Sequence, residues 1–215
     1  MRITRRRGVL GLGVAAFCVV SLVASPAPAT IAEQRARLPP AAECADETVA
    51  GVWRSHAWSA RWDEWQVFTL YVRRVPDRPG ALVGRIENHF WAGGRDAEEP
   101  PPCAAQRGYD AVVSMRAEGS VSDDGTIRFG GVGQWTLERT NCGGMPGGYN
   151  LDVFSGQIDP TILEFQSVNN DGGRAVNEPT VFRRIRCPPT PSAEAPSVNP
   201  HPPRFYPEGG GCSWF

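Results

Sequence analysis

The chain contains no lysine, so arginine supplies all 22 basic residues of the 215-residue sequence. Four of these arginines, Arg2, Arg5, Arg6 and Arg7, precede an uncharged apolar run over residues 9–23. The remainder of the chain carries 18 basic against 23 acidic residues, a net charge of −5. This negative balance argues against the basic surface that nucleic acids and anionic membranes attract, so we expect no nucleic-acid partner.

Several motifs of enzymes and metal proteins are also missing. The sequence has no G-x-S-x-G, no phosphate-binding loop and no cysteines spaced two to four residues apart, and it has only three histidines. A zinc site needs three or four convergent ligands, and the nucleophile elbow of many hydrolases needs the G-x-S-x-G turn. We therefore expect no metal and no cofactor, and the sequence favours a binding protein over an enzyme.

The N-terminal region has the three parts of an export signal. Its basic start leads into an apolar run of 15 residues, shorter than the roughly 20 residues that span a bilayer. Ala27 and Ala29 then place small residues at positions −3 and −1 of a cut after Ala29. We expect removal of residues 1–29 and export to the periplasm, the cell surface or the medium, with no transmembrane segment in the mature protein. Arg6-Arg7 also fits the twin-arginine route, which stays open beside the general secretory route.

Between Cys44 and Cys187 the sequence alternates strand and turn patterns, without a long helical stretch. Apolar and polar residues alternate most clearly over 109–121 and 126–138, which a tight Asp-Asp-Gly turn connects. We predict eight strands, over 51–58, 65–75, 81–91, 109–121, 126–138, 149–158, 161–168 and 180–186. Sequential antiparallel strands predict an all-β fold, a single eight-stranded antiparallel up-and-down barrel whose closure removes exposed edges. A two-sheet β-sandwich is the alternative.

This pattern divides the chain into four parts. After the signal peptide, residues 30–43 are predicted to form a linker or a helical turn, and the barrel domain is expected to span 44–187. Residues 188–215 contain eight prolines, which predicts an extended tail without regular structure.

The strand order predicts how the five remaining cysteines pair, since export places them in an oxidising compartment. Cys103 and Cys142 follow the third and fifth strands, whose ends meet at one end of the barrel. Cys44 and Cys187 flank the first and last strands, which are neighbours in a closed barrel. We predict these two disulfides and expect Cys212 to be free or to pair with another chain.

The sequence Gly-Val-Trp at 51–53 resembles the G-x-W motif of the lipocalins and their calycin relatives. In that group the tryptophan packs across the closed barrel end beneath a basic residue of the last strand. The resemblance implies this role for Trp53, with Arg183, Arg184 or Arg186 above it, and we favour Arg184. It also implies a barrel that binds a small, usually apolar molecule. The second common motif of the group, T-D-x-x-Y, is missing, and the proline-rich tail replaces the helix that follows the last strand.

Tryptophan is the most unusual component of the barrel region. Six of the seven tryptophans lie there: Trp53, Trp58, Trp62, Trp65, Trp91 and Trp135. Their rings suit sugars or flat apolar ligands, although they also suit a packed core. The loops at the end opposite Trp53 are the longer ones, and we predict that they form the mouth: 59–64, 92–108, 139–148 and 169–179. We predict Trp58, Trp62, Trp91 and Arg174 as ligand contacts, with Arg174 suited to a ligand carboxylate.

These observations favour an exported small-molecule-binding protein of lipocalin-like architecture, with an apolar or aromatic-stacking ligand at one barrel end. The alternatives are a secreted hydrolase of carbohydrates or lipids and a structural or partner-binding protein of the cell envelope. Asp152 and Glu164 on adjacent predicted strands would give a hydrolase two carboxylates. Glu164 lies between Leu163 and Phe165, however, and we expect it to point to solvent.

Overall fold

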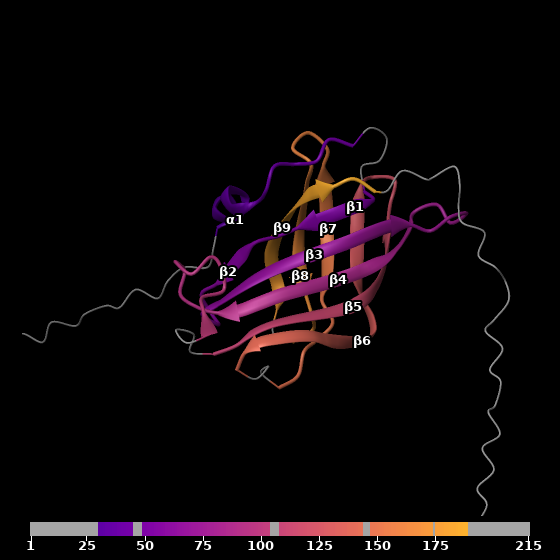
Figure 1. The fold of residues 1–215 in the computed structure, drawn as a ribbon. Helices are drawn as coiled ribbons and strands as arrows, with labels where there is room; N and C mark the ends of the chain where they lie inside the picture. The colour runs from indigo at the N-terminus through magenta and orange to yellow at the C-terminus, as the bar shows by residue number, and fades with distance from the viewer. Residues whose placement is uncertain (1–29, 45–48, 104–107, 144–146, 174, 189–215) are drawn as a thin grey trace, which may run out of the picture.

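The computed structural model describes residues 30–44, 49–103, 108–143, 147–173 and 175–188 as an all-β barrel with one short helix (Figure 1). Its elements are α1 (Ile31–Arg37), β1 (Gly51–Arg54), β2 (Ala57–Ser59), β3 (Glu64–Arg74), β4 (Ala81–Ala92), β5 (Asp110–Val121), β6 (Thr126–Cys142), β7 (Val153–Asp159), β8 (Glu164–Asn170) and β9 (Val176–Arg186). The predicted signal peptide, Arg174, Cys212 and the tail beyond residue 188 lie outside the described residues. None of the helices in the described ranges is long and apolar enough to cross a membrane.

Strand β1 closes the barrel because it pairs on both sides. Trp53 stands opposite Leu70 of β3 on one side and opposite Arg184 of β9 on the other. The remaining neighbours follow one another in sequence from β3 to β9, all antiparallel. The predicted eight-stranded up-and-down barrel is therefore confirmed over the β-sandwich, with β2 as one additional strand.

The first predicted strand, 51–58, is wrong as a single element. It is divided into β1 and β2, which both pair with β3. At the break, Ser55 is fully buried, its backbone N–H donates to the Phe68 carbonyl at 2.9 Å, and its Oγ accepts from the Phe68 N–H at 3.1 Å. A serine hydroxyl that bonds backbone in this way competes with a regular strand ladder, and alternation of side chains gives no sign of it.

Strand alternation builds the core as the sequence predicts. In β5, the side chains of Ala111, Val113, Met115 and Ala117 are all buried. The same core contains one phenylalanine from each of six other strands: Phe68, Phe90, Phe129, Phe154, Phe165 and Phe182. Leu137, which lies in the alternating segment 126–138, is 43 % exposed. Its part of β6 runs past the start of β7, whose pairing begins with Val153 opposite Gly130.

Trp53 lies at the closed end of the barrel. It is 2 % exposed, and its indole N–H donates to the Val49 carbonyl at 2.8 Å. The guanidinium carbon of Arg184 is 5.7 Å from the ring centroid, within the range of a cation–π contact. Gly51 has φ 135°, and a Cβ there would lie 2.5 Å from the Arg186 carbonyl oxygen. The Trp–Arg contact implied by the resemblance is present in the structure, at the arginine that the sequence favoured.

Both predicted disulfides are present. The Cα atoms are 5.5 Å apart in Cys44–Cys187 and 5.3 Å apart in Cys103–Cys142. The segment 30–43, expected as a linker or helical turn, contains α1, which lies against the outside of the barrel (Figure 1). Gln34 holds it there, because its side chain accepts from the Val181 N–H and donates to the Pro179 carbonyl, both at 3.0 Å.

Candidate functional site

A pocket of about 240 Å³ opens at the barrel end opposite Trp53. Its lining is mostly polar, with four carboxylates, four amides and four aromatic side chains. They are Glu64, Asp152, Asp171, Glu178, Gln66, Asn88, Asn150, Asn169, Trp62, Phe68, Phe90 and Tyr149. Three of the four loops predicted to form the mouth, 59–64, 139–148 and 169–179, contribute to this lining.

The alternation of β3 explains why the pocket is polar. Val72, Leu70 and Phe68 belong to the barrel core, and the next positions on the same row, Gln66 and Glu64, line the pocket. The inward row therefore changes from apolar to polar as it approaches the mouth. The pattern of the sequence did not predict this change, because the tryptophans on the opposite face of β3 and β4 are the more unusual feature.

A chain of hydrogen bonds crosses one wall of the pocket. The Val153 N–H donates to Asn169 Oδ1 at 3.3 Å, and Asn169 Nδ2 donates to Asp152 Oδ1 at 2.8 Å. The Tyr149 hydroxyl donates to Asp152 Oδ2 at 2.6 Å and accepts from Asn88 Nδ2 at 2.7 Å. Each bond fixes the direction of the next, so the network holds four side chains from three parts of the barrel in one arrangement.

This arrangement determines which atom of Asn88 stays without a partner. The single hydroxyl proton of Tyr149 goes to Asp152, so Tyr149 accepts from Asn88 and the amide must present its nitrogen. Asn88 is 1 % exposed, and its Oδ1 has no hydrogen-bond partner within the described part of the chain. A buried acceptor in that state costs about 1–3 kcal/mol.

Burial changes the protonation of the two acidic groups in this chain. Loss of hydration raises the pKa of Asp152 from 3.8 to about 7, although the hydrogen bonds from Tyr149 and Asn169 oppose the rise and the charge of Asp171 adds to it. Burial, followed by the charge of Asp152, raises the pKa of Tyr149 well above 10.0. Tyr149 therefore acts as a hydroxyl donor at neutral pH, while Asp152 changes charge there.

Glu64 supplies a second buried carboxylate to the pocket. It is 1 % exposed. Gln66 Nε2 donates to its Oε1 at 2.6 Å, and the Tyr109 hydroxyl donates to its Oε2. Those donors fix the direction of the carboxylate at the pocket wall.

No family model matches the chain, and no curated protein or solved structure is significantly similar to it. A relationship to the lipocalins and calycins therefore stays a prediction. The function has to be argued from the pocket itself.

Two of the predicted ligand contacts, Trp58 and Trp91, do not line the pocket. With Trp65 they form a buried cluster on the outer face of β2, β3 and β4. The three indole N–H groups donate to backbone carbonyls within 93–97, at 2.9–3.1 Å. The guanidinium of Arg37 covers the Trp65 ring at 4.9 Å. These tryptophans hold the 93–97 segment against the barrel wall. Trp58, Trp65 and Trp91 therefore have a packing role, which was the alternative to ligand binding.

Trp62 is the predicted contact that does line the pocket. It is 38 % exposed in the turn between β2 and β3. Arg174 lies outside the described residues, and its predicted role remains a prediction. The next residue, Ala175, lines the pocket.

Asp152 and Glu164, the two carboxylates that the hydrolase alternative would need, do not lie together. The expectation that Glu164 points to solvent is wrong. Glu164 is 1 % exposed, and it forms ion pairs of 2.7 Å with Arg35 and with Arg183 on the outer side of the barrel. Glu164 pairs with Asp159 at the closed end of β7. Asp152 precedes Asp159 by seven residues. At the rise of an extended strand, this separates Asp152 from Glu164 by roughly 20 Å.

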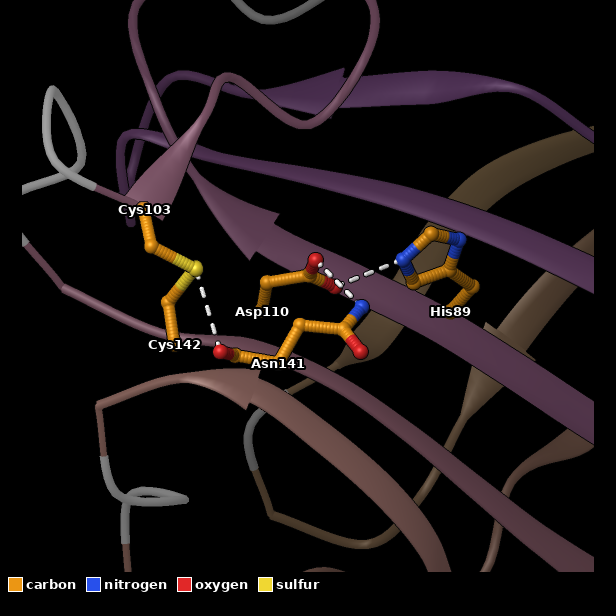
Figure 2. Close-up of a disulfide and its surroundings, with 5 residues drawn as sticks. All are labelled: His89, Cys103, Asp110, Asn141 and Cys142. Atoms are coloured by element: carbon orange, nitrogen blue, oxygen red, sulfur yellow. Dashed lines mark hydrogen bonds and ion pairs between the residues drawn. A yellow bond between two sulfur atoms is a disulfide. The ribbon is translucent and has the colours of Figure 1, made fainter.

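A polar cluster of His89, Asp110 and Asn141 lies beside the Cys103–Cys142 disulfide (Figure 2). One oxygen of Asp110 is 2.7 Å from His89 Nε2, and the other accepts from Asn141 Nδ2 at 2.7 Å. The cluster connects β4, β5 and β6 and therefore has a structural role. Within the described ranges, no group of three or more His, Cys, Asp or Glu side chains is arranged to hold a metal ion.

Proposed function

We propose that the protein is exported and binds a small polar molecule in the pocket at the barrel mouth. The observation that carries the proposal is the convergence of buried polar side chains on an enclosed space of about 240 Å³. Burial of polar groups costs free energy, and ligand sites are the places where a few such groups converge within a largely preformed cavity.

The lining favours a ligand different from the apolar one that the resemblance implies. Asn88, Asp152 and Glu64 present acceptors, whereas Phe68 and Phe90 present apolar faces deeper in the barrel. A ligand with hydrogen-bond donors at one end and an apolar group at the other matches both sets. The volume limits it to a small molecule and excludes a long acyl chain.

A hydrolase is the second candidate, supported by Asp152 and Glu64 in the same pocket. The pKa of Asp152, raised by burial to about 7, suits a general acid. Both oxygens of Asp152 accept hydrogen bonds from Tyr149 and Asn169, which favours a structural or electrostatic role. Turnover of glycoside or ester substrates that is lost in Asp152→Asn would support the hydrolase instead.

Blocking the mouth is expected to abolish binding. Gly147 lines the pocket, and an added Cβ would meet no atom within 4 Å, so Gly147→Phe places a ring at the mouth without strain. Small amines, amino acids, polyols and monosaccharides are screened for thermal stabilisation of the protein, and ligands found are titrated by calorimetry. We expect at least a tenfold loss of affinity in the variant, about 1.4 kcal/mol.

Ile162→Phe is the matched control. Ile162 is 43 % exposed in the turn between β7 and β8 at the closed end, and a ring added there leaves the mouth open. Equal affinities in both variants would place the ligand elsewhere, and a screen without any ligand would remove the binding proposal.

Export is tested by the N-terminus of the mature protein. The basic start, the apolar run and Ala27 and Ala29 support it, and the two disulfides fit an oxidising compartment. Protein recovered outside the cytoplasm of an expressing bacterium is expected to begin at Thr30 or within a few residues of it. Soluble cytoplasmic protein that retains Met1 would contradict export.

A further inference from the structure

The buried carboxylates of the pocket already have partners within the protein. Both oxygens of Asp152 accept hydrogen bonds, and so do both oxygens of Glu64. Glu178 also has a partner. Hydrogen bonds to a carboxylate stabilise its charged form, so these groups do not depend on a cationic ligand. The polar atoms that remain available at the pocket wall therefore decide the class of ligand.

Three side chains of the lining keep polar atoms without a hydrogen-bond partner in the part of the chain that the structure describes. Gln66 donates from Nε2 to Glu64 and leaves its Oε1. Asp171 accepts at Oδ1 from two backbone N–H groups of its own loop, at 2.7 and 2.9 Å, and leaves its Oδ2. The Asn150 amide makes no hydrogen bond there and offers both a donor and an acceptor. Asn150 is exposed and the two others are half-buried, so a ligand can reach all three.

These side chains lie on opposite walls of the pocket. Gln66 belongs to β3, and Asn150 directly precedes β7, which is four places away from β3 in the closed ring of strands. Strands four places apart in an eight-stranded barrel face each other across its interior. Asp171 lies on the side of Asn150, because a Cβ added at Gly173 would be within 4 Å of both side chains. A single polar group of a ligand cannot reach both walls, whereas a ring with hydroxyl groups at several positions can.

We propose that the ligand is a neutral monosaccharide, whose hydroxyl groups bond Gln66 on one wall and Asn150 and Asp171 on the other. A hydroxyl group both donates and accepts, so it matches the two acceptors and either atom of the amide. The C–H face of the sugar ring would lie against Phe68 and Phe90, deeper in the pocket. The volume of about 240 Å³ is below the range of about 300–1,000 Å³ that drug-sized ligands occupy, which limits the ligand to one sugar ring. This inference rests on the proposed function, since it names the ligand class of the same pocket.

Ring compounds with different numbers of hydroxyl groups test the proposal. Hexoses, 6-deoxyhexoses, pentoses, N-acetylhexosamines and cyclohexanol are titrated into the mature protein by calorimetry. We expect at least one monosaccharide to bind tenfold or more tightly than cyclohexanol, whose single hydroxyl reaches only one wall.

The charge of the ligand is tested with the uronate and the amino sugar that correspond to the best monosaccharide. Four carboxylates line the pocket, so we expect the uronate to bind at least tenfold more weakly than the neutral sugar. The amino sugar is expected to bind no more tightly than the neutral sugar, because the buried carboxylates already have partners.

Asn150→Ala removes the amide from one wall. The side chain makes no hydrogen bond to the described residues, so the melting temperature should stay unchanged while sugar affinity falls at least tenfold. Gln166→Ala is the matched control, because Gln166 is an exposed amide of β8 outside the pocket lining, and it should keep the wild-type affinity. Among the monodeoxy forms of the sugar, one should bind wild type and Asn150→Ala equally, since it lacks the hydroxyl group that Asn150 bonds.

The outcomes separate this inference from the proposed function. Equal binding of sugars and cyclohexanol that Gly147→Phe still blocks would overturn the sugar and keep the pocket. Tighter binding of the uronate or the amino sugar would overturn the neutral ligand, and wild-type sugar affinity in Asn150→Ala would overturn the assigned contact. If no monosaccharide binds while another ligand from the screen does, the inference fails alone. If nothing binds in the pocket, both proposals fail.

Discussion

Replacing Cys44 and Cys187 together with alanine is expected to lower the free energy of unfolding by about 3–5 kcal/mol. This disulfide joins residues 143 positions apart, so it restricts nearly the whole barrel region in the unfolded chain. It also fastens the segment after α1 to the end of β9, beside the strand that closes the barrel. Reversible urea denaturation under non-reducing conditions measures the change.

Two further variants serve as controls. Removing Cys103 and Cys142 opens a loop of only 39 positions, and chain entropy predicts a loss about 1 kcal/mol smaller. Cys212→Ala is expected to leave stability unchanged, because Cys44 pairs with Cys187 and Cys103 pairs with Cys142. A loss below 1 kcal/mol for the Cys44 and Cys187 variant would contradict the long-range role of this bond.

The sequence contains enough information for the barrel because strand alternation and tight turns are local signals. The alternation from Ala111 to Ala117 marks a strand with one buried face, and the turn 123–125 fixes its connection to β6. In an up-and-down barrel, successive loops alternate between the two ends. The order of the strands therefore shows at which end each cysteine lies: Cys44, Cys103, Cys142 and Cys187. No distant contact is needed for either inference.

The predictions for Glu164 and Trp91 were wrong because another segment of the chain covers the outer face of their strands. Glu164 has the outward position expected from Phe165, yet Arg35 of α1 and Arg183 bury it. Trp91 also points outward, and the 93–97 segment covers it. Alternation distinguishes the two faces of a strand, but it does not show which outward face will be covered, because that depends on segments far away in the sequence.

The sequence predicted the position of the pocket, but it did not predict that the lining would be polar. Loop parity places the mouth opposite Trp53, where the pocket lies. Its chemistry depends on polar residues at inward positions, such as Gln66 and Asn88, which in an isolated sequence look like interruptions of a strand. A polar residue at an inward position near the mouth end of a strand is the sequence signal that would have predicted the polar lining of the pocket.

Asp152→Asn is expected to change how stability depends on pH. In the folded protein the Asp152 pKa is raised to about 7 by burial, whereas the unfolded value is near 3.8. The folded state therefore keeps a proton that the unfolded state releases. The stabilisation from the neutral carboxyl group is complete below pH 4 and is lost as the pH rises to 7. A shift of this size corresponds to about 4 kcal/mol.

Asparagine is neutral at every pH, so the variant lacks this loss. Between pH 4 and pH 9, the unfolding free energy of the variant is expected to increase by about 4 kcal/mol relative to that of the wild type. Other titrating groups cancel in that difference. Tyr149→Phe provides the second test: the Tyr149 hydrogen bond lowers the Asp152 pKa, so its loss should move the midpoint above pH 7. A constant difference between Asp152→Asn and wild type across this range would mean that Asp152 is hydrated. The pocket would then be open to water around the Asp152 carboxyl group.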